Sequence, residues 1–199
     1  MTGNRQQGGA ELLPWTRVVT PHNDIVEGNL SMDTYAVNLD LVIQGSKTIH
    51  PVYKDARTFF EATYLTHELR RILTDVMGVL ADRNGDRVLQ LRTPFGGGKT
   101  HTLLALYHLA HSRDQLKALP DLANLPDPGL VHIAVISGVQ QGAADRSNTR
   151  RRTLWGELAQ QIGGDAAYAQ VAEQDQLGVA PGGDAVSYTH LTLPTILRV

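Results

Sequence analysis

The chain has 199 residues, of which 42% are hydrophobic and 19% charged, with 18 basic against 20 acidic side chains. This composition is typical of a soluble globular protein, and the near balance of charge gives no sign of nucleic-acid or membrane binding. The absence of cysteine excludes disulfides and thiolate metal sites and fits the cytoplasm, where we expect the protein to act.

The N-terminal part of the chain predicts little regular structure. Residues 1–11 are polar and glycine-rich, and we expect a disordered lead, not a signal peptide. Prolines and β-branched residues follow and predict extended chain with turns, in which Trp15 anchors packing, as Trp155 does later. No apolar run approaches the roughly 18 residues that a membrane span needs, so no membrane contact is expected.

Residues 12–85 are predicted to form a mainly helical region. Apolar positions at helical spacing predict one helix from Ser31 up to Gly45, a short one from Asp55, and a longer one after Thr66. The apolar stripe of the longest helix consists of Leu69, Ile72, Leu73, Val76 and Leu80. Arg70 and Arg71 fall on its polar side and are predicted to face solvent.

Residues 86–185 alternate between strand and helix patterns, which predicts an α/β fold with a parallel sheet. "RVLQLRT" predicts a short strand, and "LVHIAVISG" predicts a buried parallel strand. Helices are predicted at "KTHTLLALYHLAHS" and at "RRTLWGELAQQIGG". Their expected apolar faces carry Leu103, Leu104, Tyr107 and Ala110 in the first helix, and Leu154, Leu158 and Ile162 in the second.

"TPFGGGKT", residues 93–100, lies between the first strand and its helix and predicts a phosphate-binding loop. Glycines let several backbone N–H groups approach phosphate oxygens and permit positive φ, so Gly96, Gly97 and Gly98 would form the cradle. The positive end of the following helix would face the phosphates. Lys99 would reach the β- and γ-phosphates, and Thr100 would bind the magnesium ion of the nucleotide.

Several alternatives stay open for this loop. The common pattern is G-x-x-x-x-G-K-[ST], and Thr93 replaces its first glycine. His101, one turn into the helix, contacts nucleotide, supports the loop or simply packs. A kinase or a GTPase would use the same loop, although the missing N-K-x-D motif weakens the GTPase reading, and a non-catalytic binding fragment is a further alternative.

"LPWTRVVTPHNDIVEG", "FFEATYLTHELRRIL" and "LQLRTPFGGGKTHTLLALYHL" resemble the family called "domain of unknown function 499". The resemblance covers roughly residues 12–184, and Thr93 is itself the family's form. It implies an AAA-type P-loop ATPase of prokaryotes, associated with phage defence, of which this chain would be the N-terminal part. It also implies ATP and Mg²⁺ as cofactors, with residues 96–100 as ligands. DNA or defence-system proteins would be partners of the larger protein, which could form an oligomer.

Hydrolysis by a P-loop enzyme also needs a Walker B carboxylate at a strand end. The only later strand pattern ends in Ser137 and Gly138, so no catalytic residue is assigned and enzymatic activity is expected only of the larger protein. Arg150, Arg151 and Arg152 form a basic run that is either solvated or contacts nucleic acid or phosphate.

The last residues, 186–199, do not resemble the family. "VSYTHLTLPT" is similar to one reading frame of a transposase adapter used in shotgun sequencing, which implies that this tail is not native. A genuine edge strand rich in threonine and leucine is the alternative.

Overall fold

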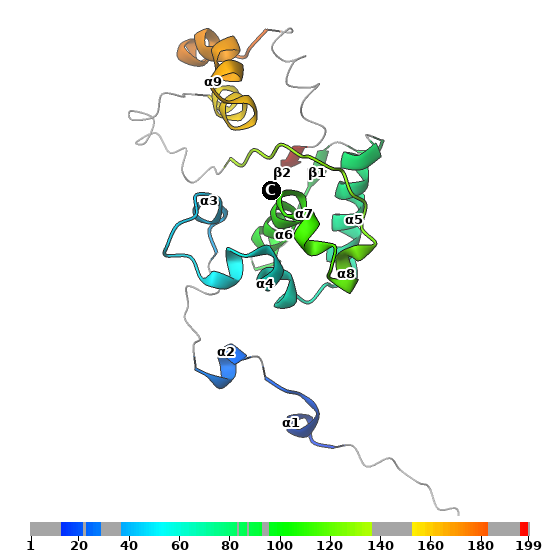
Figure 1. Cartoon of the computed structure of the whole chain (residues 1–199). Helices are drawn as coiled ribbons and strands as arrows, with labels where there is room; N and C mark the ends of the chain where they lie inside the picture. The colour runs from blue at the N-terminus through cyan, green and yellow to red at the C-terminus, as the bar shows by residue number, and fades with distance from the viewer. Residues whose placement is uncertain are drawn as a thin grey trace, which may run out of the picture. The chain divides into compact units, whose positions relative to one another are not determined.

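The computed structural model describes residues 13–21, 23–28, 37–82, 84–86, 88–92, 96–136, 153–182 and 196–198. The contacts within the chain divide it into two units, Met1–Ala36 and Val37–Val199. In both units the described residues are mostly helical (Figure 1).

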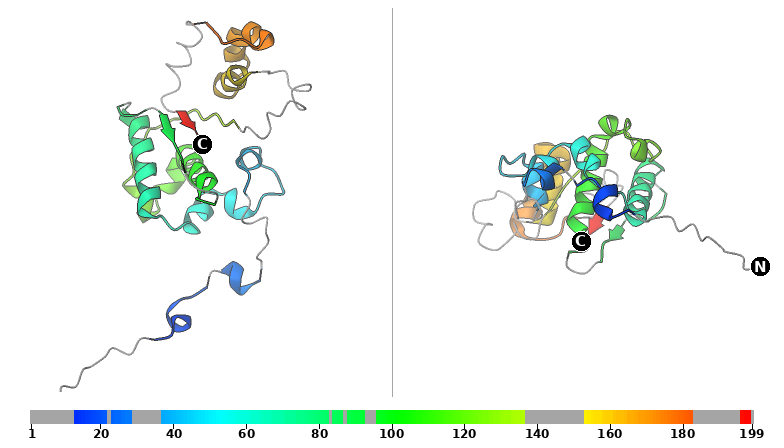
Figure 2. Two further views of the ribbon diagram at one scale, coloured as in Figure 1. Left: turned by 180° about the vertical axis from the view of Figure 1, so that it is seen from behind. Right: turned by 90° about the horizontal axis from the view of Figure 1, so that it is seen from below.

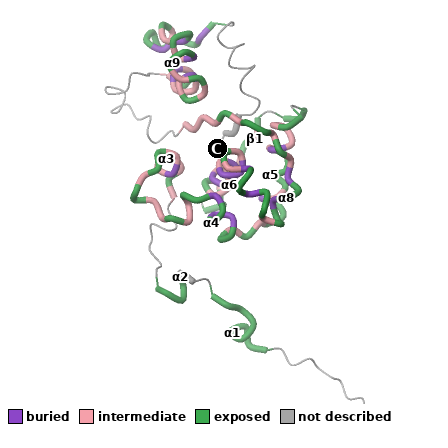
Figure 3. Tube along the Cα trace, viewed as in Figure 1, coloured by how far each residue is buried: buried purple, intermediate pink, exposed green. Residues whose placement is uncertain are grey.

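The N-terminal unit contains two one-turn helices, α1 (Trp15–Val18) and α2 (Asn23–Val26). Its large apolar side chains are exposed, as the green tube of Figure 3 shows. The prediction that Trp15 anchors packing is wrong for this structure, because 72% of its surface is exposed. A four-residue helix has no second turn to present a continuous apolar face, so propensity alone does not bury this tryptophan.

The second unit is built around α6 (Lys99–His111). The other helical elements of this unit are α3 (Leu39–Ile43), η2 (Pro51–Tyr53), α4 (Ala56–Glu61), α5 (His67–Asp82), α7 (Arg113–Leu116), α8 (Pro120–Ala123) and α9 (Leu154–Leu177). Helices α3, α4, α5 and α7 all contact α6, which lies between them in Figure 1. The largest buried side chains of this core are Phe59, Leu73, Met77, Leu104, Leu109, Leu116 and Leu122.

Because neighbours surround α6, its buried side chains do not form the single stripe that the sequence predicted. Leu104 is buried as expected, but Leu103, Tyr107 and Ala110 are only half-buried. The completely or nearly covered side chains are Leu104, Ala105, Leu106, His108 and Leu109. A helix that is packed on several sides loses the clear amphipathic pattern that a surface helix shows.

Local capping explains why α4 and α5 begin where the sequence predicted. Asp55 caps α4 by accepting hydrogen bonds from the Thr58 amide at 2.8 Å and the Thr58 hydroxyl at 2.7 Å. The Thr66 hydroxyl accepts from the Leu69 amide at 3.2 Å at the start of α5. These oxygens satisfy amides that a helix cannot pair internally. The predicted helix from Ser31 is confirmed only as α3, because residues 31–36 lie outside the described part of the chain.

The described strands are β1 (Val88–Gln90) and β2 (Ile196–Arg198), which pair in parallel with Val88 opposite Ile196. They lie side by side in Figures 1 and 2. The strand predicted before the glycine loop is thus confirmed as β1. Its neighbour comes from the tail whose native origin we doubted on sequence grounds, and that origin stays a prediction.

Residues 130–136, predicted to be a buried parallel strand, form no strand in the structure. The side-chain amide of Gln161 contacts this segment instead: it accepts from the Val135 amide at 2.8 Å and donates to the Val135 carbonyl at 2.9 Å. A strand needs a neighbouring strand for its ladder, and here one carboxamide supplies the donor and the acceptor. The apolar pattern of residues 130–136 does not indicate this contact with Gln161.

Helix α9 contains a break at Gly164, whose backbone is not helical (φ 61°, ψ −154°). Its side chains on the predicted face, Leu154, Leu158 and Ile162, are exposed or half-buried, so that face is wrong. Buried instead are Ala159, Ala167 and Val171, and the carboxylate of Asp175, which is 1% exposed. Asp175 accepts from the Thr153 amide, the Thr153 hydroxyl and the Tyr168 hydroxyl at 2.6–3.0 Å, and so joins the two ends of α9.

Among the described residues, no helix combines the length and the apolar composition that crossing a bilayer requires.

Candidate functional site

The predicted phosphate-binding loop leads directly into α6. Gly98 is the N-cap residue with a left-handed backbone (φ 75°, ψ 14°), and Gly96 also has positive φ, at 79°. Helix α6 begins at Lys99, and the Thr102 amide makes its first bond to the Gly98 carbonyl at 2.9 Å. The boundary expected from the sequence is therefore correct. Residues with a Cβ atom rarely adopt this backbone conformation, so glycine is required at positions 96 and 98.

The three glycines form an exposed surface at the N-terminal end of α6. Gly96, Gly97 and Gly98 are all exposed, Thr100 is exposed and Lys99 is half-buried. A Cβ added at Gly96 or Gly98 would meet no atom within 4 Å, so the space above these two residues is open. Helix geometry leaves first-turn amides without acceptors inside the helix and gives this end a partial positive charge. An anionic group of the size of a phosphate fits these requirements.

The ring of His101 contacts α4 and the segment that follows α4. Its Nε2 lies 3.2 Å from the Thr63 hydroxyl, and its ring centroid lies 4.8 Å from that of Phe59. The Thr63 hydroxyl in turn donates to the Phe59 carbonyl at 2.7 Å. Burial lowers the pKa of His101. Of the alternatives for this residue, the structure favours support of the loop helix, and direct nucleotide contact stays a prediction.

Two turns further along α6, His108 contacts the same phenylalanine. Its ring centroid lies 5.2 Å from that of Phe59, and its Nε2 lies 2.9 Å from the Tyr53 carbonyl, to which it donates. Burial is the main cause that lowers the pKa of His108, and the Tyr53 hydrogen bond and the Asp55 charge oppose it. Phe59 is thus held by both histidines, and this contact fixes α4 against the helix that follows the glycine loop.

Sequence reasoning missed the segment that reaches the loop helix from α4. Thr63 and Leu65 are half-buried, whereas Tyr64 between them is 86% exposed. Thr63 is tied to His101 in the first turn of α6. The contact joins residues 38 positions apart, and nothing in the local pattern of "ATYLT" signals it. The sequence pattern therefore predicts no role for Thr63 or Tyr64.

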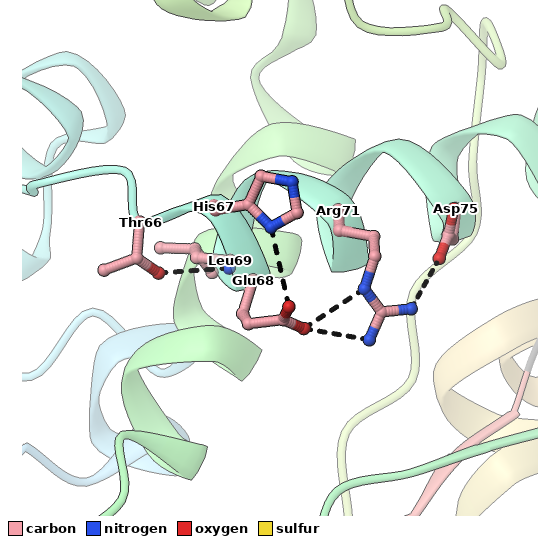
Figure 4. Close-up of polar contacts among 6 residues, drawn as sticks. All are labelled: Thr66, His67, Glu68, Leu69, Arg71 and Asp75. Atoms are coloured by element: carbon pink, nitrogen blue, oxygen red, sulfur yellow. Dashed lines mark hydrogen bonds and ion pairs between the residues drawn. The ribbon is translucent and has the colours of Figure 1, made fainter.

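The polar face of α5 carries charged side chains that contact one another in a chain (Figure 4). The Glu68 carboxylate contacts His67 at 3.5 Å and Arg71 at 3.0 Å, and Arg71 reaches Asp75 at 3.4 Å. All four side chains are more than half exposed, so solvent screens these pairs. The prediction that Arg71 faces solvent is confirmed. Arg70 does more than expected, because it binds the Asp121 carboxylate at 2.8 Å and so joins α5 to α8.

Other residues singled out by the sequence lie outside the described part of the chain, namely Thr93, Ser137 and the arginines at 150–152. Within the described part, no group of three or more histidine or acidic side chains is arranged to hold a metal ion. A magnesium ion at the loop would therefore depend on Thr100 together with phosphate oxygens and water.

Comparison of the chain with known proteins finds one matching family. No curated protein and no solved structure matches the chain. A family model described as "DUF499 N-terminal domain" matches residues 21–127, which is more than half of the chain. The match runs from α2 to the end of α8 and its neighbouring loop, and includes the glycine loop and all of α6. The chain belongs to the DUF499 family.

Proposed function

We propose that the chain binds ATP with Mg²⁺ through residues 93–100. The observation that carries the proposal is the open pair of left-handed glycines, Gly96 and Gly98, directly before a 13-residue helix that begins with Lys99 and Thr100. The N-cap residues of α4 and α9 have extended backbone and accept a hydrogen bond from the first turn through their side chains, whereas Gly98 has left-handed backbone and no side-chain cap. Glycine instead leaves room for a ligand against the backbone.

The residues present fit such a ligand. Backbone amides of the loop and the first turn would hold the phosphates, and the Lys99 ammonium would neutralise part of their charge. The Thr100 hydroxyl is exposed at the second helical position and would supply one oxygen to the metal. The bound nucleotide would supply the phosphoanhydride and most of the metal's ligands. We assign no catalytic residue in this chain.

For the larger protein we propose the activity of an AAA-type ATPase that remodels DNA or protein in prokaryotic phage defence. This part of the proposal rests on the family resemblance and on no residue described here. A P-loop kinase, a GTPase and an inert nucleotide binder are the alternatives within the same loop chemistry.

Titration calorimetry of the 199-residue chain with Mg–ATP tests the binding proposal. Lys99→Ala should abolish binding, because the lysine charge neutralises phosphate, and should leave the circular dichroism spectrum unchanged. Lys47→Ala is the matched control, since Lys47 is exposed and lies outside the loop, and it should bind like the wild type. Unchanged ATP affinity in Lys99→Ala would sink the assignment. Parallel titrations with GTP separate an ATP-selective site from a GTPase.

A further inference from the structure

Tyr64 is an exposed aromatic side chain beside the phosphate loop whose role the fold does not explain. It is 86% exposed, and in the part of the chain that the structure describes its side chain makes no hydrogen bond and no ring contact. Tyrosine combines a flat apolar ring with a polar hydroxyl, and a ring held outward in a fixed segment is available to stack on a flat ligand.

The segment around Tyr64 is fixed on both sides. Thr63 bonds to the Phe59 carbonyl at 2.7 Å and contacts His101 at 3.2 Å, and Leu65 packs against the core. The Thr66 amide donates to the Tyr64 carbonyl at 3.0 Å, and Thr66 also caps α5. Thr63 and Leu65 are half-buried and Tyr64 between them is exposed, and the hydrogen bond from Thr66 to Tyr64 closes a tight turn that holds this backbone. Its exposure therefore follows from a held backbone and does not reflect a loose loop end.

The location of this segment indicates which ligand Tyr64 contacts. His101 directly follows Lys99 and Thr100, and the Thr63 contact brings Tyr64 beside the first turn of α6. A nucleotide whose phosphates lie on that turn must place its sugar and base close by, outside the loop. A base has two flat apolar faces, and an aromatic ring can stack on one of them without any hydrogen bond.

We propose that Tyr64 stacks on the base of the nucleotide held by residues 96–100. This inference rests on the proposed function, because the phosphate loop is what brings a base to Tyr64. The Thr63–His101 contact is the positioning element that keeps the tyrosine beside the loop helix. Since stacking tolerates every base, Tyr64 contributes affinity and little selectivity between ATP and GTP.

Two ligands separate the base contact from the phosphate contact. Mg–ATP engages both, whereas magnesium tripolyphosphate has no base and engages only the loop. In calorimetric titrations of the whole chain, Tyr64→Ala should weaken ATP binding about five- to a hundredfold and leave tripolyphosphate binding within about twofold of wild type. Tyr64→Phe keeps the ring and should restore ATP affinity. Leu130→Ala, which truncates a 91% exposed apolar side chain outside this segment, is the control and should change neither.

Each contrary result has a separate meaning. Wild-type ATP affinity in Tyr64→Ala would overturn the stacking role and leave the phosphate loop intact as a binding site. An equal loss for both ligands would also overturn it, because the substitution would have disturbed the loop. If the wild type bound neither ligand, the proposed function itself would fail, and the stacking role with it.

Discussion

Two of the histidines on α6, His101 and His108, differ from exposed histidines in how protonation affects the stability of the fold. His101 and His108 both contact Phe59, and burial lowers the pKa of each. A histidine whose pKa is lowered by folding resists protonation in the native state, while the unfolded chain takes up the proton near the ordinary pKa of 6.5. Their contribution to stability is therefore present above about pH 6.5 and is lost as the pH falls.

At the residue scale, the free energy of unfolding should decrease between pH 7.5 and pH 5.5, as measured by urea titration at each pH. His108→Gln should show a shallower decrease, because glutamine can still donate to the Tyr53 carbonyl but does not titrate in this range. His67→Gln is the control, since His67 is 89% exposed in its side chain. A slope for His108→Gln equal to that of the wild type would contradict the burial argument.

Asp55 adds a second acid-sensitive group at lower pH. Hydrogen bonds from the Thr58 amide and hydroxyl lower the pKa of its carboxyl group below the ordinary value of 3.8. Because the folded state prefers the charged form, this contribution is present above about pH 4 and is lost as the pH falls further. Asp55→Ala should shorten or fray α4 and lower stability by about 1 kcal/mol at pH 7, measured by urea unfolding. Asp55→Asn, which can still cap, should lose less.

At the scale of the element, two glycines inside helices have opposite surroundings. Gly78 lies in α5, and a Cβ there would meet only Pro126 at an ordinary 3.9 Å. Gly156 lies in α9, and a Cβ there would overlap the Asp175 carboxylate, which is held by Thr153 and Tyr168. The first glycine therefore costs helix stability without a packing reason, and the second allows the buried carboxylate to approach the helix.

Gly78→Ala should raise the free energy of unfolding by about 0.5–1 kcal/mol through helix propensity. Gly156→Ala should lower it by about 1–3 kcal/mol, because overpacking outweighs the same propensity gain. Urea unfolding of both variants beside the wild type measures the difference. Gly182→Ala, where the added methyl group meets no atom within 4 Å, gives the baseline for a harmless substitution. Equal effects at 78 and 156 would show that Asp175 does not occupy the place described.

The elements also show which features the sequence could predict. Helices α4, α5 and α6 were predictable because Asp55, Thr66 and Gly98 mark their starts within a few residues. Segment 130–136 was not, because whether it forms a strand depends on a neighbour, and here Gln161 occupies that place. The phosphate loop was likewise a local pattern, whereas the contact of Thr63 with His101 joins distant positions. The sequence predicts helix starts and loops that depend on neighbouring residues, but it does not predict contacts between distant segments.

At the scale of the whole molecule, burial is distributed unevenly. The core around α6 contains fully buried Leu104 and Leu109, while the apolar side chains of residues 13–28 are exposed. Amide hydrogen exchange should therefore be slowest in α6 and fastest in the N-terminal unit, because exchange follows local opening free energy. Mass spectrometry of peptides after timed labelling measures both. Strong protection in residues 13–28 would show that this unit packs against a surface in solution.

If the loop binds ATP as proposed, binding should stabilise the core around α6, because α6 connects the loop to that core. With ATP at about a hundred times its dissociation constant, the free energy of unfolding should rise by about 2.7 kcal/mol. Thermal or urea unfolding with and without Mg–ATP measures this change. Lys99→Ala should show no increase, and an equal increase in that variant would place the nucleotide elsewhere.

The carboxamide of Gln161 takes the place of a neighbouring strand at segment 130–136. It meets both polar backbone groups of Val135 as a neighbouring chain would, yet it does so from one rotatable side chain. A true strand arriving at this segment could take over the same two bonds while the glutamine swings out to water. Val135 would exchange one pair of partners for an equivalent pair. Gln161 therefore satisfies at Val135 the two backbone groups that a neighbouring strand would otherwise pair.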